Sequence, residues 1–439
     1  MEDERHEIRR GLLFLGSAGV FARVVDLAAI VVVLFFVTKE ELGAATVAWA
    51  LTTIAEAAVG IGLGMAVVQT PTLDERLERA SLTFAMLSGV VLAIALGSLG
   101  PFVATWTGDP NVTGYLAVSA AKLVFVGASL VPLHLLTRAL RFRSFGAVQV
   151  VATLLAAATR VAAAMGGLGA WAIVLGHALH PLFVLLTLAL VKAKIPRPTL
   201  DLAGIGPLLR FGVRSSASEV LERFHRHADT LLVNHFLGPG AVGVYKVAMD
   251  VTGGVATAIG DIVNKAALPV LSRLAGERER FAEAFLWATK KVVSLAGPVL
   301  LAVAVLGGPF IAAIQGGEFA SASVLLPFLA VAAFLRLVFQ LFPMAFYAQG
   351  HPEESLRLAV ISIGVLFVVL GGALATLGQS IGLLAAGLGW LLHYPAIAPF
   401  AYRALWRTTG LRCRDHLRLK SPHAGEGARA ERETKVHSA

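Results

Sequence analysis

Residues 213–235 read VRSSASEVLERFHRHADTLLVNH, and this charged segment lies between long apolar runs. On a helix, Glu219, Glu222, Arg223, Arg226 and Asp229 fall at spacings of three and four, which gathers them onto one face. The chain as a whole is 57% hydrophobic and has a mean hydropathy of +0.76. If the segment crosses a bilayer, its charges must face water or one another. We therefore interpret it as one wall of a polar translocation cavity.

The composition indicates a polytopic helical membrane protein, because charged residues make up only 15% of the 439 and apolar runs recur throughout. The first run, residues 12–37, is too long for the hydrophobic region of a signal peptide, so we expect an anchored helix there. Cys413 is the only cysteine, which excludes an intrachain disulfide. The net charge is +9, but the basic residues are not interleaved with aromatic residues, so no nucleic-acid partner is expected.

The apolar runs predict an all-α fold with twelve transmembrane helices in two six-helix lobes. The first lobe, residues 1–191, has helices at 12–37, 42–68, 80–105, 115–137, 145–165 and 170–191. The second lobe, residues 211–402, has helices at 211–236, 241–268, 285–306, 321–348, 356–377 and 380–402. Residues 192–210 form a Pro-containing cytoplasmic connector, and residues 403–439 form a basic cytoplasmic tail that we expect to be disordered at its end.

The distribution of basic residues predicts the orientation. Most Lys and Arg residues outside the predicted helices lie in the termini and in alternate connections, whereas Lys39 is the only one in a predicted external loop. The positive-inside rule then places both termini in the cytoplasm, which requires an even number of spans. We expect a multi-pass protein of the cytoplasmic membrane.

The two halves also resemble each other weakly. A shift of 200 residues places Arg23 over Arg223 and Gly43 over Gly243, and a shift of 208 places GPF at 100–102 over GPF at 308–310. With six spans each, both halves would enter the membrane from the same side, which predicts a parallel pseudo-repeat. The alternative is coincidence.

Several short motifs carry a family resemblance. They are GIGLGMAVVQ at 60–69, LRFR at 140–143, GLGAWA at 167–172, DTLLV at 229–233, LGP at 237–239, GVY at 243–245 and LPVLSRL at 268–274. With these motifs the chain resembles the polysaccharide or oligosaccharide-lipid flippases of the multidrug/oligosaccharidyl-lipid/polysaccharide exporter superfamily, up to about residue 407. The first external turn departs from the pattern, since TKEELG at 38–43 stands where the family usually has Leu-Gly-Pro before the acidic pair.

The resemblance implies alternating-access movement of a lipid-linked, pyrophosphate-linked oligosaccharide to the outer leaflet, for synthesis of a surface lipopolysaccharide or exopolysaccharide. Such a head group is large and anionic, so it needs polar partners within the membrane. The implied partners are this substrate and membrane lipid, with a glycan polymerase or export machinery as further possibilities. The sequence has no GxxxxGK[ST] phosphate loop, and His177 and His180 have no evident third metal ligand. We therefore expect neither a cofactor nor a metal, and no enzymatic activity.

Arginines are the predicted head-group contacts, because a guanidinium group can hold two phosphate oxygens at once. Arg23, Arg223 and Arg226 lie nearest the mid-depth of the first and seventh predicted helices. Arg160 on the fifth helix and Arg336 on the tenth have no evident local acid and are further candidates. The alternative for the first three is pairing at helical spacing, with Asp26, Glu219 and Glu222. The alternative for the other two is pairing across helices or snorkelling.

Three aspartates are candidates for ion coupling, because a carboxylate near cations can change its protonation as a cavity opens: Asp229, Asp250 and Asp261. The alternative is a salt bridge, for example between Asp250 and Lys246 one turn earlier. Lys122, close to a predicted helix end, is interpreted as interfacial.

Other functions remain open. An ion-coupled drug or organic-cation antiporter of the same fold would be expected to have unpaired acids and aromatic walls. A lipid-linked peptidoglycan precursor flippase is a second alternative, although that branch generally has two further helices. A membrane enzyme is a third, but the predicted external loops are short.

Overall fold

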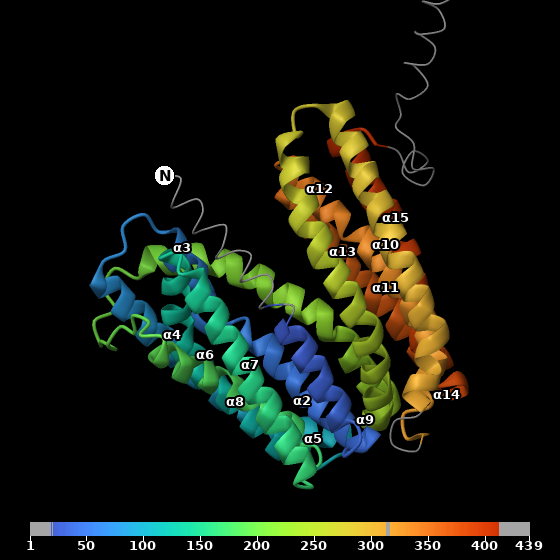
Figure 1. Ribbon diagram of the computed structural model, residues 1–439, viewed down its shortest axis with the longest axis horizontal. Coiled ribbons are helices and arrows are strands. Elements are labelled where there is room, and N and C mark those ends of the chain that lie inside the picture. Colours follow the sequence, from blue (N-terminus) through green and yellow to red (C-terminus); the bar gives the residue numbers. More distant parts are fainter. Residues whose placement is uncertain (1–18, 20, 313–316, 412–439) are drawn as a thin grey trace, which may run out of the picture. The chain divides into compact units, whose positions relative to one another are not determined.

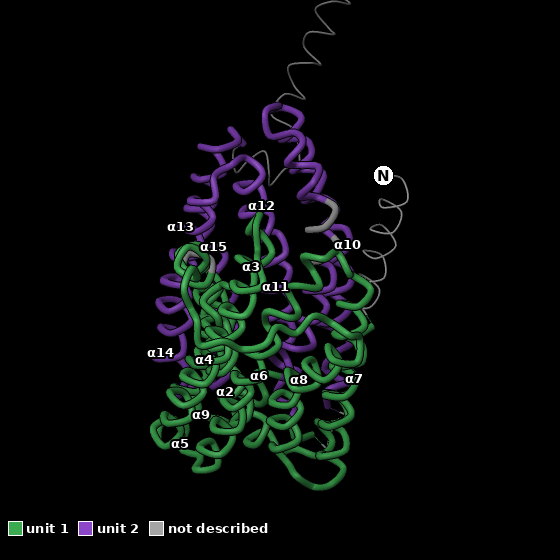
Figure 2. Tube along the Cα trace, turned by 90° about the vertical axis from the view of Figure 1, so that its left-hand side faces the viewer, with its two compact units in different colours: residues 1–246, 314–318 green, residues 247–313, 319–439 purple. Residues whose placement is uncertain are grey.

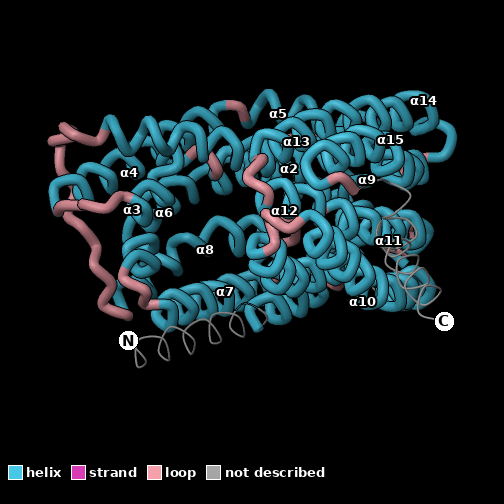
Figure 3. Tube along the Cα trace, turned by 90° about the horizontal axis from the view of Figure 1, so that it is seen from above, coloured by secondary structure: helices cyan, strands magenta, loops and turns pink. Residues whose placement is uncertain are grey.

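A computed structural model of the chain describes residues 19, 21–312 and 317–411, and every regular element within these ranges is a helix (Figure 3). Nine helical segments of the described residues are long and apolar enough to cross a membrane. The chain is therefore an all-α, multi-pass membrane protein. By their contacts the residues divide into two compact units, distinguished by colour in Figure 2: unit 1 is Met1–Lys246 with Ile314–Glu318, and unit 2 is Val247–Ala313 with Phe319–Ala439.

Unit 1 contains a helical stretch at residues 21–33 and the first part of the long helix α9 (Gly206–Arg273). Its other helices are α2 (Lys39–Glu56), the 3₁₀ turn Val59–Gly62, α3 (Leu63–Gln69), α4 (Glu75–Ser98), α5 (Gly100–Thr107), α6 (Val112–Arg138), α7 (Phe142–Met165) and α8 (Trp171–Leu190). The helix α6 is central to this unit, since it packs against α2, α4 and α8, while α7 packs against α8 (Figure 1).

The described residues of unit 2 contain the rest of α9, six further α-helices and a π-helical turn. They are α10 (Arg278–Ala312), α11 (Ala322–Phe339), α12 (Leu341–Ala348), α13 (Pro352–Leu366), the π-helical turn Phe367–Gly371, α14 (Gly372–Ile381) and α15 (Leu384–Thr409). Its core is aromatic, with Phe281, Phe285, Phe342 and Phe346 fully buried. The helix α15 packs against α11, α13 and α14.

The predicted helices agree with the observed ones in position but not always in continuity. The predicted helix at 80–105 is two helices, α4 and α5, because Pro101 starts a new helix. The predicted helices at 211–236 and 241–268 both lie in α9, and they are separated at Gly238, where φ is 78° and ψ is 178°. The turn between these two predicted helices, at residues 237–240, is thereby confirmed. Of the first predicted helix, residues 12–18 and 20 lie outside the described ranges.

The glycine motif at 60–69 breaks the second membrane segment. Gly60, Ile61 and Gly62 all have positive φ values, of 71°, 46° and 71°. A Cβ atom on Gly62 would collide with the backbone of Gly212 in α9, so this position requires glycine both for its conformation and for the close approach. The Ser216 hydroxyl donates to the Ala57 carbonyl at 3.0 Å, which satisfies an acceptor freed by the break. The break therefore fixes the end of α2 against α9.

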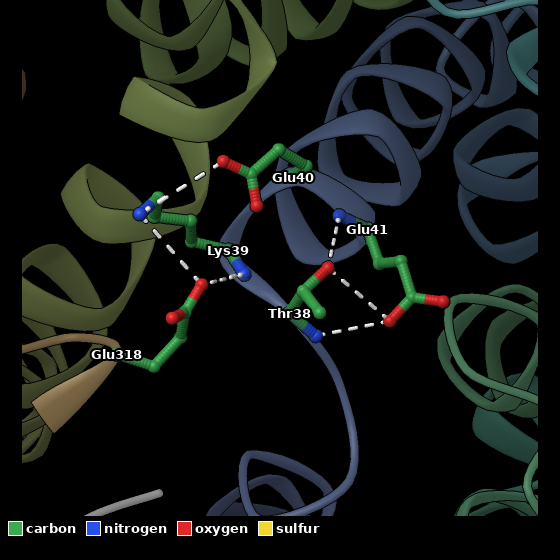
Figure 4. A network of polar contacts seen from close by, with 5 residues as sticks. All are labelled: Thr38, Lys39, Glu40, Glu41 and Glu318. Atoms are coloured by element: carbon green, nitrogen blue, oxygen red, sulfur yellow. Dashed lines mark hydrogen bonds and ion pairs between the residues drawn. The ribbon is translucent and has the colours of Figure 1, made fainter. Parts of the chain in front are cut away.

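The other end of α2 is fixed by a capping box (Figure 4). The Glu41 N–H donates to the Thr38 hydroxyl at 3.2 Å, and the Thr38 N–H donates to the Glu41 carboxylate at 2.9 Å. Beside it, the Lys39 ammonium lies 3.7 Å from the Glu318 carboxylate. The turn that departs from the family pattern is thus an ordinary helix start, and Lys39 has an acidic partner there.

The connector is held on α4 by polar contacts. The Arg76 guanidinium lies 2.8 Å from the Asp201 carboxylate, and the Lys194 ammonium lies 2.5 Å from the Glu78 carboxylate. The pKa of Asp201 is lowered, chiefly because the Ala203 N–H donates to its carboxylate and secondly because Arg76 is near. The connector is thus bound to the N-terminal end of α4 by these two ion pairs.

Candidate functional site

An ion network in the interior of unit 1 joins three helices. The Lys122 ammonium of α6 lies 2.8 Å from the Glu56 carboxylate, which ends α2. Arg223 of α9 lies 3.9 Å from Glu56 and 2.9 Å from Glu219. The Lys122 side chain is only 7% exposed. Lys122, interpreted from the sequence as interfacial, thus lies well inside α6 (Val112–Arg138), with its side chain in a buried ion pair.

Arg160 of α7 forms a second buried ion pair, with Asp26 of the helical stretch 21–33. Its side chain is 3% exposed, and Nε and Nη1 of its guanidinium group have no hydrogen-bond partner among the described residues. The pairing across helices is one of the two alternatives that the sequence left open for Arg160. Asp26 therefore pairs with a distant arginine rather than with Arg23 three residues earlier.

Trp49 and three histidines adjoin these ion pairs. His180 of α8 lies within electrostatic range of Glu56, Lys122, Asp26 and Arg160. The His177 imidazole stacks on the Trp49 indole, with ring centroids 5.3 Å apart. The His227 ring meets the same indole edge-on, with ring centroids 4.9 Å apart. The Lys246 ammonium lies 5.1 Å from the centroid of the Trp49 ring.

We call three basic residues and two acids of unit 1 the cationic cluster: Lys122, Arg160 and Arg223 with Asp26 and Glu56. The described residues leave guanidinium donors of both arginines unsatisfied, including Nε of Arg223. A buried donor without an acceptor costs roughly 1–3 kcal/mol. The cluster is therefore suited to an added anion that supplies acceptor oxygens.

The remaining predicted head-group contacts lie in different surroundings. Arg23 is exposed. Arg226 is 58% exposed, and its guanidinium lies 3.6 Å from the Glu222 carboxylate one turn earlier, as the pairing alternative predicts. Arg336 belongs to unit 2, where it is half-buried and donates to the Thr257 hydroxyl at 3.4 Å.

The predicted coupling aspartates are also distributed over the chain. Asp229 is fully buried in unit 1 and accepts hydrogen bonds from the Tyr245 hydroxyl at 2.6 Å and from the Thr230 N–H at 2.7 Å. Asp250 is half-buried in unit 2. The side chain of Asp261 lies outside the part of the chain that the structure describes.

Sequence reasoning did not select Glu56, Lys122 or Trp49 as functional residues. Each lies in an apolar helix, and its partner is on another helix far away in the sequence. The available signal was the presence of two unlike charges, Glu56 in the second predicted span and Lys122 in the fourth, since intramembrane charges usually pair.

Comparison with known proteins identifies the family of the chain. A family model described as polysaccharide biosynthesis protein matches residues 33–324. The chain is 22% identical over 369 residues to the Escherichia coli K12 lipopolysaccharide biosynthesis protein WzxC, covering 79% of this chain and 72% of WzxC. It is 22% identical over 354 residues to the Bacillus subtilis teichuronic acid biosynthesis protein TuaB, covering 78% and 73% of the two chains.

Solved structures share the fold at lower identity. The lipid II flippase MurJ in an inward closed conformation has a TM-score of 0.72 and 12% identity, covering 93% of this chain and 90% of MurJ. An inward-facing multidrug resistance MATE family transporter of the MOP superfamily has a TM-score of 0.67 and 15% identity, covering 88% and 96%. These two likenesses concern the fold, whereas the family model matches the sequence over more than half of the chain, and so the chain belongs to the polysaccharide biosynthesis protein family.

Proposed function

We propose that this protein is a flippase that moves a lipid-linked oligosaccharide from the cytoplasmic to the outer leaflet of the cytoplasmic membrane by alternating access. The family and the names of WzxC and TuaB support a role in making a surface polysaccharide. A glycan polymerase or export machinery would receive the product.

The cationic cluster is the observation that carries this proposal. A lipid-linked glycan is joined to its carrier through phosphate or pyrophosphate, and this anion must leave water while it crosses. In the cluster, Arg160 and Arg223 have guanidinium donors that lack acceptors among the described residues. Phosphate oxygens would supply these acceptors, and the guanidinium geometry suits them.

The same residues disfavour the drug antiporter. An organic cation needs a carboxylate that is free to receive it, but Asp26 is paired with Arg160 and Glu56 with Lys122.

The topology completes the proposal. Twelve spans arise if residues 12–37 form one span and α9 supplies two, on either side of Gly238, in addition to the nine apolar candidates. We assign them to a lobe of residues 1–191 and a lobe of residues 211–402, with residues 192–210 and 403–439 in the cytoplasm. The repeat partners Gly43 and Gly243 support a parallel pseudo-repeat, because their contacts are reciprocal. A Cβ on Gly43 would lie 1.7 Å from the Pro239 carbonyl oxygen, and a Cβ on Gly243 would lie 1.9 Å from the Lys39 carbonyl oxygen, 200 residues earlier.

The exposed arginines Arg23 and Arg226, and Arg336 in unit 2, remain proposed head-group contacts, since a charge within a span avoids lipid. Asp229, Asp250 and Asp261 remain proposed ion-coupling groups on the same reasoning.

Transport in proteoliposomes tests the function. The purified chain is reconstituted with a fluorescent polyprenyl diphosphate oligosaccharide, and a membrane-impermeant glycosidase reports the fraction of glycan that reaches the opposite leaflet. We expect the wild type to accelerate flipping, and Arg223→Gln to lower the rate at least tenfold, as removal of a charged hydrogen bond of about 1.5–3 kcal/mol would do.

Arg280→Gln is the matched control, because Arg280 also pairs with an acid close in sequence, Glu277 at 2.7 Å just before α10, but is 69% exposed and lies outside the cluster. Its rate should equal that of the wild type. A wild-type protein that moves no lipid-linked glycan, while it moves an organic cation, would reject the proposal in favour of the antiporter.

A further inference from the structure

Trp49 has surroundings that differ from those of a tryptophan that fills an apolar core. Its indole contacts two imidazoles and one ammonium group, from His177 of α8, His227 of α9 and Lys246 of α9. We call these four residues the Trp49 box. All four are half-buried residues of unit 1.

The Trp49 box adjoins the cationic cluster along one helix face. Trp49, Thr53 and Glu56 are spaced by four and three residues on α2, so their side chains lie on the same side of the helix. Trp49 and Glu56 are thus separated by about 10 Å along the axis. The Thr53 hydroxyl between them has no hydrogen-bond partner among the described residues. A polar stripe therefore runs from the indole to the Glu56–Lys122 pair.

The two ends of this stripe have different chemistry. The cationic cluster offers ammonium and guanidinium donors, which suit phosphate oxygens. The Trp49 box offers an aromatic face bordered by groups that donate or accept hydrogen bonds. A sugar ring has an apolar C–H face and hydroxyl groups around its edge, and an aromatic face with polar neighbours matches this pattern.

We propose that the Trp49 box is a monosaccharide subsite, which binds the sugar nearest the phosphate linkage while the cationic cluster binds the phosphates. This inference rests on the proposed function. That function assigns residues to the phosphates of the substrate, and the inference assigns residues to its first sugar. The His177 imidazole occupies the stacking position on Trp49, so an incoming sugar takes the place of that imidazole.

Two lipid probes separate the subsites. The full-length protein in nanodiscs is titrated with a polyprenyl diphosphate and with the same lipid carrying one glucose, galactose or N-acetylglucosamine, and the dissociation constants are measured. The wild type should bind at least one sugar-bearing lipid more tightly than the bare diphosphate. Trp49→Leu, which keeps apolar volume but removes the ring, should remove this gain, a loss of about fivefold to tenfold. It should leave the affinity for the bare diphosphate within twofold.

Companion variants keep the result interpretable. Trp49→Phe, which restores an aromatic face, should recover most of the gain from the sugar. Trp287→Leu should bind both lipids like the wild type, because Trp287 forms a similar cation–π pair with Lys291 at 5.8 Å but is an exposed residue of unit 2. Arg223→Gln should weaken both lipids by the same factor.

Other outcomes overturn the inference in recognisable ways. Equal loss of both lipids in Trp49→Leu, or no loss of either, would show that Trp49 is structural. A wild type that binds the bare diphosphate but gains nothing from any sugar would remove the subsite and leave the proposed anion site standing. A wild type that binds neither lipid would remove both proposals.

Discussion

At the scale of single residues, the Glu56–Lys122 pair allows the cost of a buried charge to be separated from its role in transport. Both side chains are largely buried, at 26% and 7% exposure. Removing one partner leaves the other uncompensated, which typically costs about 3–5 kcal/mol, whereas replacing both with neutral groups of similar size is often tolerated.

We predict that Lys122→Gln and Glu56→Gln each lower the thermal unfolding temperature of the purified protein, and that the double variant regains most of the loss. The double variant should still transport poorly, because the cluster has lost a cation. Fluorescence-monitored melting and the liposome assay measure the two effects. Additive destabilisation in the double variant would mean that the two side chains do not interact.

A second residue-scale prediction separates two arginines of one helix. The Arg223 side chain is 24% exposed and forms ion pairs with Glu56 and Glu219. The Arg226 side chain is 58% exposed, and within the described part of the chain it forms an ion pair with Glu222 alone. Neutralising Arg223 should therefore slow flipping more strongly than neutralising Arg226, by about tenfold. The liposome assay on Arg223→Gln and Arg226→Gln measures the ratio, and equal rates would mean that the cluster does not dominate head-group binding.

At the scale of elements, the break after α2 is required by packing as well as by backbone conformation. Gly62 has a φ of 71°, and a Cβ there would collide with the Gly212 backbone. Gly167 has a similar φ of 75° but nothing within 4 Å of the added atom. We predict that Gly62→Ala destabilises the protein by about 1–3 kcal/mol more than Gly167→Ala, since only the first adds overpacking to the conformational cost.

Thermal unfolding of both glycine variants measures this difference. Equal effects would mean that α9 moves away without penalty and that the close approach does not hold α2. A larger loss in Gly62→Ala, together with normal membrane insertion, would identify the contact of the break with α9 as the element that positions Glu56 and Trp49.

At the scale of the whole molecule, the single cysteine makes the proposed topology directly testable. Cys413 follows α15, in the basic tail that the positive-inside rule assigns to the cytoplasm. A membrane-impermeant maleimide should label it only after intact cells are permeabilised. In a Cys413→Ser background, Lys39→Cys should be labelled in intact cells, because residue 39 lies in a proposed external loop. If Cys413 were labelled in intact cells, as residue 39 is, the number of spans between the two sites would be even. The proposed topology, which has an odd number of spans between them, would then be wrong.

The amino-acid sequence by itself determined the helical membrane class, most of the helix positions, the turn at Gly238 and the family, because these depend on local hydropathy, on backbone preferences and on short motifs. It also identified Arg160 and Arg223 as intramembrane charges. Only the tertiary structure decided that Arg160 pairs with Asp26, that Lys122 pairs with Glu56, and that Trp49 lies among His177, His227 and Lys246. The physical reason is that the partner of a buried charge is set by which helices pack together, and helical spacing along one segment carries no information about a neighbour that is a hundred residues away.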